Sequence, residues 1–227
     1  MSVIARGPTL GKQVYRFVRE RIINGGYRPG HVLSESELAQ ELNVSRTPVS
    51  IALTILLERG LLEQRNGKFA VPTLTITDVI DLYMCRLAFD GLATRLAAAT
   101  ISEEDIGRLE RHLKVWENPP REDDLYALWV ADFGFHETIY QLTDNRHLIR
   151  FAQIATELAS VYRRNTIRRL DTDKRRSRED VRREHQLILE ALAAHDPTRA
   201  ETAARQHIEN VIAHLEQMEV IGPDDVS

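Results

Sequence analysis

Residues 29–72 read PGHVLSESELAQELNVSRTPVSIALTILLERGLLEQRNGKFAVP, and this stretch decides the fold of the first part of the chain. Ser34 followed by Glu37 predicts a capping box at the start of a short helix over residues 35–42. A tight turn then leads to Ser45, which we expect to cap a second helix. Two short helices joined by so brief a turn indicate a helix-turn-helix.

The second of these helices, over residues 46–59, changes character along its length. It begins with the polar residues Arg46 and Thr47. Its later apolar residues fall on one side and are expected to be buried: Val49, Ala52, Leu53, Leu56 and Leu57. A recognition helix has this arrangement, because its first residues enter the major groove of DNA while the rest packs on the domain.

A hairpin is predicted directly after the second helix. Residues 61–64 and 69–71 are expected to be its strands, and the turn over residues 65–68 contains Asn-Gly, a strong hairpin signal. Arg65 and Lys68 flank the tip, where a hairpin can reach a phosphate or the minor groove. The alternative is that both are ordinary solvated charges. With a helix over residues 10–22, these elements form a winged helix-turn-helix.

Charge is distributed unevenly along the 227 residues, whose net charge is −4. Residues 1–73 hold ten Lys and Arg against six Glu, a net +4, whereas residues 74–227 hold 20 against 28 acids, a net −8. We expect two domains divided there, of which only the first meets a polyanion. The alternative explanation is chance variation in surface charge.

The expected location and the kinds of metal site also follow from composition. No apolar run of about eighteen residues occurs, and the opening residues lack the apolar centre of a secretory signal. We therefore expect a cytoplasmic protein without a membrane partner. The single cysteine, Cys85, has no second cysteine for a disulfide or a thiolate site. Any metal must then be held by histidines and carboxylates.

The remainder of the chain has the pattern of an all-helical bundle, so the fold class is mainly α. The expected helices cover residues 77–100, 102–118, 123–143, 146–169, 177–195 and 197–220. The basic run over residues 174–178 is surrounded by acids, and we interpret it as a solvated helix start.

Four polar residues interrupt the inward-facing stripes of this bundle. Asp132 and His136 lie one turn apart among apolar residues, while His185 and His207 occupy inward positions on the last two helices. The reversal between those helices, at Asp196-Pro197, is eleven residues from each histidine. The two imidazoles should therefore lie level and face each other.

Buried ionisable groups cost several kcal/mol unless they are paired or metal-bound, so the four residues need a shared partner. Three imidazoles and one carboxylate suit Zn²⁺, Ni²⁺ or a related divalent ion, with further positions for water or ligand oxygens. The alternative is a buried network of hydrogen-bonded His and Asp.

The first domain resembles the GntR family of bacterial repressors, and LAxxLxVSRTPV is its most specific motif. The resemblance implies that Arg46 contacts a guanine or the adjacent phosphate, that Thr47 contacts a phosphate, and that Gly67 lets the wing approach the DNA backbone. Arginine is also the preferred bidentate reader of guanine. Two departures stand out: the usual Arg-Glu after SRTPV is Ser50-Ile51, and a frequently basic position is Ser36. The DNA sequence of the operator therefore cannot be inferred from the operators of related proteins.

The second domain resembles the FCD domain of the FadR-like branch, through the DxxxH of Asp132 and His136, the EH of residues 184–185 and the late His207. The resemblance implies metal binding by the four residues, a homodimer, and a pocket for a carboxylate metabolite. Arg86 matches a recurrent family arginine and could pair with the effector's carboxylate. Its alternative role is a salt bridge to Asp90, four residues later on the same helix.

These features favour a metabolite-responsive transcriptional regulator, a repressor that binds an inverted repeat in double-stranded DNA. One alternative is a metal-dependent enzyme, since three histidines and an open coordination position can activate water. We find no distinct acid–base pair near the cluster, and an enzyme would not need the first domain. The other alternative is a regulator whose metal is purely structural or is itself the signal.

Overall fold

The computed structural model describes residues 9–121, 125–170 and 177–220. The chain divides into two compact units, Met1–Thr75 with Ser160–Thr166 and Ile76–Ala159 with Ile167–Ser227. Within the described residues, helices predominate and the strands form one small sheet, which confirms the predicted fold class.

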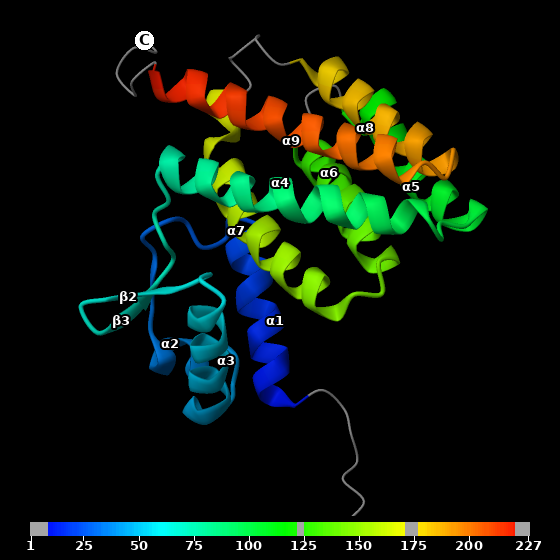
Figure 1. Cartoon of the computed structure of the whole chain (residues 1–227). Coiled ribbons are helices and arrows are strands. Elements are labelled where there is room, and N and C mark those ends of the chain that lie inside the picture. Colours follow the sequence, from blue (N-terminus) through cyan, green and yellow to red (C-terminus); the bar gives the residue numbers. More distant parts are fainter. Residues whose placement is uncertain (1–8, 122–124, 171–176, 221–227) are drawn as a thin grey trace, which may run out of the picture. The chain divides into compact units, whose positions relative to one another are not determined.

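The helices of the first unit are α1 (Leu10–Ile23), α2 (Glu35–Glu41) and α3 (Arg46–Glu58), so the predicted helix-turn-helix is confirmed (Figure 1). The Ser34 hydroxyl accepts a hydrogen bond from the Glu37 backbone N–H at 3.4 Å. No reciprocal bond from the Glu37 side chain is found at this start, so only half of the predicted capping box forms. Ser45 holds the N-cap position of α3, but its side chain makes no capping hydrogen bond, contrary to expectation.

The sheet consists of β1 (Val32–Leu33), β2 (Glu63–Arg65) and β3 (Lys68–Ala70), in the antiparallel order β1-β3-β2. Its hairpin turn is shorter than predicted. Arg65 pairs with Lys68 in the strands, and only Asn66 and Gly67 form the turn, with φ of 52° and 73°. Positive φ at both central residues is typical of the two-residue turn that matches the twist of a hairpin. The two-residue strand β1 was not predicted, because so short a strand has no detectable alternation.

Apolar side chains from α1 and α3 form the core of the first unit. Val18, Leu53 and Leu62 are completely or almost completely buried. Most of the apolar residues predicted to face inward on α3 are buried as expected, and Leu57 is half-buried. Burying an apolar side chain of this size contributes about 1.5–3 kcal/mol to the free energy of unfolding. These contacts hold α3 in place, so that its first turn remains exposed at a fixed position on the domain.

The second unit contains α4 (Ile76–Ala98), α5 (Glu103–Glu117), α6 (Leu125–Leu142), α8 (Arg178–Ala193) and α9 (Pro197–Val220). It also contains most of α7 (Arg146–Leu170), of which Ser160–Thr166 is assigned to the first unit. Helix α4 packs against α9, α6 and α8, and α5 packs against α6 and α8 (Figure 1). Ser102 and Ser177 start α5 and α8 with complete capping boxes. The predicted helix start at Asp123 and the basic residues 174–176 lie outside the described residues.

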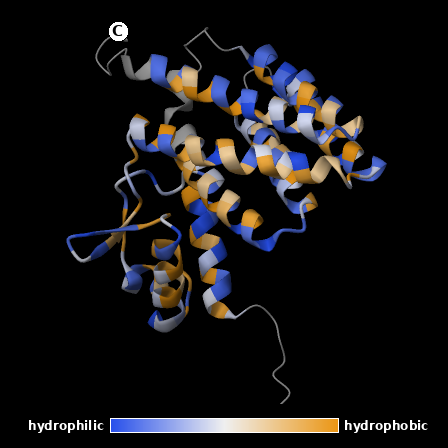
Figure 2. Cartoon of the chain, viewed as in Figure 1, coloured by the Kyte–Doolittle hydropathy of each residue, from blue (hydrophilic) through white to orange (hydrophobic). Residues whose placement is uncertain are grey.

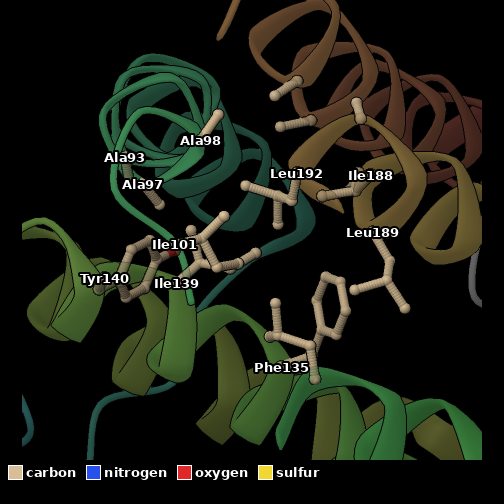
Figure 3. Close-up of a cluster of buried hydrophobic side chains, with 14 of the residues drawn as sticks. Ala93, Ala97, Ala98, Ile101, Phe135, Ile139, Tyr140, Ile188, Leu189 and Leu192 are labelled. Carbon is tan, nitrogen blue, oxygen red and sulfur yellow. The ribbon is translucent and has the colours of Figure 1, made fainter. Parts of the chain in front are cut away.

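The core of this unit lies between α4, α5, α6 and α8 (Figure 3). Phe135 and Tyr140 on α6 meet Ile188 and Leu192 on α8, and all four side chains are almost completely buried. Figure 2 shows hydrophobic and hydrophilic residues alternating along the helix ribbons, as expected for helices with one buried face. In the part of the chain that is described, no helix is both long enough and apolar enough to span a membrane.

Candidate metal centre

Four side chains from three helices converge inside the second unit. Asp132 and His136 come from α6, His185 from α8 and His207 from α9. Each is buried, and their candidate ligand atoms all lie within 4.8 Å of one another. The four residues singled out in the sequence are therefore brought together in a cluster that could hold a metal ion.

Helical spacing and one tight reversal build this cluster. His185 is four residues after Val181 and three before Ile188, and all three are buried on the same face of α8. The chain reverses through His195, whose φ is 49°, and α9 begins at Pro197. The ring centroids of His185 and His207 are 4.5 Å apart, so the prediction that they face each other is confirmed.

The Nδ1 atom of each imidazole has an acceptor beside it. Nδ1 of His185 lies 2.9 Å from the backbone carbonyl of Val181, and Nδ1 of His207 lies 2.7 Å from Glu184 Oε2. Nδ1 of His136 lies 3.3 Å from Asp90 Oδ2. A carbonyl or carboxylate oxygen can only accept, so the proton of each neutral ring sits on Nδ1. The Nε2 atoms are then left with lone pairs, as in metal-binding histidines.

Those lone pairs point into a common space. Nε2 of His136 and Nε2 of His185 are 3.3 Å apart, and Asp132 Oδ1 is 3.4 Å from Nε2 of His185. Two nitrogens that bind one zinc ion at about 2.0–2.1 Å are separated by about 3.0–3.4 Å, depending on the bond angle. The donor set and its spacing therefore fit a divalent cation, which would relieve the repulsion between the facing lone pairs.

Burial keeps an imidazole in the form that binds metal. The pKa of His136 lies well below its usual value, first because the ring is buried and second because the charge of Arg86 is near. A neutral ring at physiological pH is the form that coordinates a metal, because protonation would occupy the lone pair.

A buried ion pair adjoins the cluster. Nη2 of Arg86 lies 3.0 Å from Asp90 Oδ2, and the Tyr140 hydroxyl donates a hydrogen bond to Asp90 Oδ1. Burial is the largest single influence on the pKa of Arg86 and lowers it, but Asp90, Tyr140, Tyr83 and Asp132 together outweigh burial and hold that pKa well above its usual value. The salt bridge considered as an alternative role for Arg86 is therefore present. Its Nε is buried without a hydrogen-bond partner among the described residues.

Sequence reasoning missed the groups that orient the ligands. Glu184 adjoins His185 in the sequence, yet its carboxylate contacts His207 on the next helix and also accepts a hydrogen bond from Asn210 at 2.8 Å. Asp90 was considered only as a partner of Arg86, although it also contacts His136. Spacing along one helix cannot reveal such contacts, because each depends on how two helices pack.

The candidate DNA-contacting residues lie at the start of α3 and nearby. Ser36, Ser45 and Thr47 are exposed, and Ser50 is half-buried. The side chain of Arg46 is 71% exposed and makes one ion pair, with Nη2 3.3 Å from Glu35 Oε2. An ion pair this exposed contributes little free energy, so Arg46 can leave Glu35 and bind another partner at small cost.

The tip of the hairpin is open to solvent. Arg65 and Lys68 are exposed, and Nη2 of Arg65 lies 2.5 Å from Glu63 Oε1. Gly67 has a φ of 73°, and a Cβ atom added there would meet nothing within 4 Å. Glycine is favoured here because its φ is positive, a conformation that residues with a side chain rarely adopt. The absence of a side chain also keeps the tip of the hairpin narrow.

Comparison with known proteins adds two family matches. The profile of bacterial regulatory proteins of the gntR family matches residues 10–70, and the FCD domain profile matches residues 81–210. The HTH-type transcriptional regulator YdhC of Bacillus subtilis (strain 168) is 31% identical over 209 residues, which cover 89% of this chain and 86% of that protein. The HTH-type transcriptional repressor RspR of Escherichia coli (strain K12) is 29% identical over 211 residues, covering 92% and 90%.

Solved structures have the same fold. E. coli McbR/YncC superposes with a TM-score of 0.74 at 22% identity, covering 94% of this chain and all of that one. A transcriptional regulator GntR from Rhodococcus sp. RHA1 superposes with a TM-score of 0.72 at 24% identity, covering 91% and 97%. The chain therefore belongs to the GntR family of bacterial transcriptional regulators, in the group whose second domain is an FCD domain.

Proposed function

We propose that this protein is a metabolite-responsive repressor that acts in the cytoplasm. Residues 1–73 would bind an operator, and residues 74–227 would bind a divalent metal and a small carboxylate effector. The observation that carries the effector-binding part is the cluster of three imidazoles and one carboxylate, which shares Asp90 with the buried Arg86.

The DNA-binding part of the proposal rests on exposure and charge. Arg46 and Thr47 stand exposed at the N-terminus of α3, where a recognition helix enters the major groove. Ser36, Ser45, Ser50 and the wing residues Arg65, Gly67 and Lys68 complete the proposed contact set, and residues 1–73 carry a net charge of +4. Since a two-fold dimer reads two half-sites, the operator would be an inverted repeat.

The metal part of the proposal rests on the chemistry of the donors. Asp132, His136, His185 and His207 would hold Zn²⁺ or Ni²⁺, because imidazole and carboxylate suit these ions. The protein's contribution would be to keep each Nε2 aimed inward, by hydrogen bonds at Nδ1 of His185 and His207 and by the Asp90 carboxylate beside Nδ1 of His136.

The effector would be a small organic acid. An ion with more than four coordination positions has room for a carboxylate oxygen in addition to the four protein ligands. Arg86 lies in the same buried network and has an Nε–H that makes no hydrogen bond within the described chain. A carboxylate between the metal and this N–H would receive charge-assisted contacts from both sides.

A role as a metal-dependent hydrolase is less well supported. Such an enzyme needs a general base that can reach the water on the metal. The carboxylates beside the cluster, Asp90 and Glu184, are each already engaged with the Nδ1 of an imidazole. They orient ligands instead, which favours binding over catalysis.

Selection of DNA tests the proposal. The purified protein, with its metal content measured, is incubated with a random pool of double-stranded DNA, and the bound fraction is enriched and sequenced. We expect an inverted repeat bound at least about a thousandfold more tightly than random DNA. Failure to enrich any sequence would overturn the DNA-reading role. Adding a panel of small carboxylates to the selected complex then identifies the effector as the acid that releases DNA.

A further inference from the structure

Helix α3 carries an apolar side chain on the face that points away from the core of its own unit. Ile51 is 52% exposed, whereas Val49 and Leu53 are buried on the opposite side of the helix. Ile51 follows Thr47 by four residues, so the two side chains lie one turn apart on the same face. Thr47 is exposed too and belongs to the proposed DNA-contacting residues. Ile51 therefore extends that surface by one turn with an apolar group.

Helix α1 lies beside the Ile51 side chain without covering it. The two helices pack against each other, and a Cβ atom added at Gly11 of α1 would lie 3.6 Å from Cγ2 of Ile51 (Figure 1). Glycine is a poor helix former, but a larger residue here would fill space next to Ile51. Isoleucine is also stiff about its first side-chain torsion, because it is branched at Cβ. Ile51 thus has little conformational freedom to lose when a partner binds.

The place of Ile51 on the helix, rather than its exposure alone, indicates a role. Single apolar side chains are common on protein surfaces. Ile51, however, lies in the part of α3 that would enter the major groove. The apolar group that base pairs present in this groove is the C5-methyl of thymine, and apolar side chains recognise it by direct contact. The other base edges present hydrogen-bond donors and acceptors, which an isoleucine would leave unpaired.

We infer that Ile51 is a specificity-determining residue that recognises the methyl group of a thymine in each half-site of the operator. This inference rests on the proposed DNA-binding function and adds Ile51 to its contact set. Ile51 follows Arg46 by five residues, which is about 7.5 Å along the helix, or roughly two base-pair steps of DNA. The thymine should therefore lie about two base pairs from the guanine that Arg46 would read. Because Ile51 is a departure from the usual family sequence, this preference would be particular to this protein.

Deoxyuridine in place of thymine tests the inference, because uracil pairs in the same way and lacks only the methyl group. The operator obtained by DNA selection is synthesised with deoxyuridine at one thymine position at a time, in both half-sites together. Fluorescence anisotropy then measures binding of the full-length protein. At one position the change should weaken wild-type binding by about 4-fold per half-site, or about 15-fold in all, as expected for the loss of one buried methyl group.

A variant of Ile51 shows whether this residue makes the contact. Ile51→Ala should bind the thymine and deoxyuridine operators equally well, because it no longer reaches the methyl group. Val32→Ala is the matched control, since Val32 is a β-branched residue of the same unit that is 44% exposed but lies on β1. It should keep the full wild-type response. An Ile51→Ala protein that responds to deoxyuridine as strongly as wild type would overturn the inference.

The test does not depend on one variant. Ile51→Ala should fold, because the position is exposed and alanine is the better helix former, and thermal melting checks this. If it does not fold, Ile51→Gln also lacks the branched apolar group and should lose the deoxyuridine response in the same way. The deoxyuridine series on wild type needs no variant at all.

Failure of this inference is distinguishable from failure of the proposed function. If DNA selection enriches no sequence, the DNA-reading role fails and the assignment of Ile51 falls with it. If selection yields an operator in which no thymine methyl group affects wild-type binding, only the assignment of Ile51 is refuted.

Discussion

Asp90 Oδ2 lies 3.0 Å from Nη2 of Arg86, and the same oxygen lies 3.3 Å from Nδ1 of His136. One buried carboxylate therefore neutralises the guanidinium and orients a candidate metal ligand. A change at the metal can thus reach Arg86 through a single shared atom.

Removing this carboxylate should be costly. Asp90→Asn leaves the buried Arg86 without its counter-charge, and we expect the free energy of unfolding to fall by about 3–5 kcal/mol. Glu190→Gln is the control, because its ion pair with Arg199 is 3.5 Å long with both side chains about half exposed, and its loss should cost at most about 1 kcal/mol. Urea denaturation of the three proteins measures both values. Equal losses in the two variants would mean that the buried pair is not needed for stability.

Loss of an imidazole should remove the metal. The purified protein is expected to contain about one divalent ion per chain, and His185→Ala and His207→Ala should both lose it and melt at a lower temperature. His147→Ala is the control, because His147 is exposed and not among the four clustered residues. Elemental analysis after dialysis against metal-free buffer decides the point. Unchanged metal content in both cluster variants would contradict the site.

The buried neutral state of His136 should make stability depend on pH. The pKa of His136 is lowered in the folded protein, mainly by burial, whereas a histidine of the unfolded chain titrates near about 6.5. Below about pH 6.5 the unfolded state therefore binds more protons, so the free energy of unfolding should fall on acidification. Above that pH the ring of His136 is neutral in both the folded and the unfolded state. Its contribution to the free energy of unfolding is then fully present.

Denaturation of metal-free protein at pH 7.5 and pH 5.5 measures this effect. His136→Gln should lose less stability than wild type between the two pH values, because it removes the titrating group. His147→Gln, which changes an exposed histidine, should behave like wild type. The same loss in wild type and His136→Gln would show that this ring does not set the dependence.

Two variants of the first unit should distinguish residues that recognise bases from residues that contact phosphates. Arg46→Ala should cost about 1–3 kcal/mol of operator binding and relax the sequence preference, since arginine reads guanine with two hydrogen bonds. Lys68→Ala should weaken binding to all sequences by a similar factor and reduce the salt dependence. Fluorescence anisotropy with operator and scrambled duplexes distinguishes the two. An Arg46→Ala protein that binds the operator as well as wild type would refute the assignment.

Patterns within one helix, or across one tight reversal between two helices, were sufficient to predict much of the fold. The spacing of Asp132 and His136 and the equal distances of His185 and His207 from the reversal predicted a cluster that the structure contains. The turn at Asn66-Gly67 could also be predicted from the sequence, because the positive φ angles of such a turn favour asparagine and glycine.

Features that depend on packing between elements could not be predicted. Strand β1 has two residues and exists only because β3 pairs with it. The contact of Glu184 with His207 depends on how α8 lies against α9. Ser45 has the sequence of a cap but makes no capping bond, because an N-cap hydroxyl can turn elsewhere without ending the helix.

The central claim is that the effector binds at the metal and changes the affinity for DNA. If both ligands act through the same two conformations, each must change the other's affinity by the same factor, typically about 5- to 150-fold. Asp132→Ala and Arg86→Ala should then keep operator affinity without effector, provided that thermal melting shows folded protein, but lose the response.

The most direct measurement is operator affinity by anisotropy, with and without the acid identified by the DNA-release assay, for wild type, Asp132→Ala and Arg86→Ala. We predict that the acid lowers the affinity of wild type at least about 5-fold and leaves that of the two variants within about 2-fold of their effector-free values. Release of all three proteins to the same extent would contradict the account, because the effector would then bind away from both the metal and Arg86.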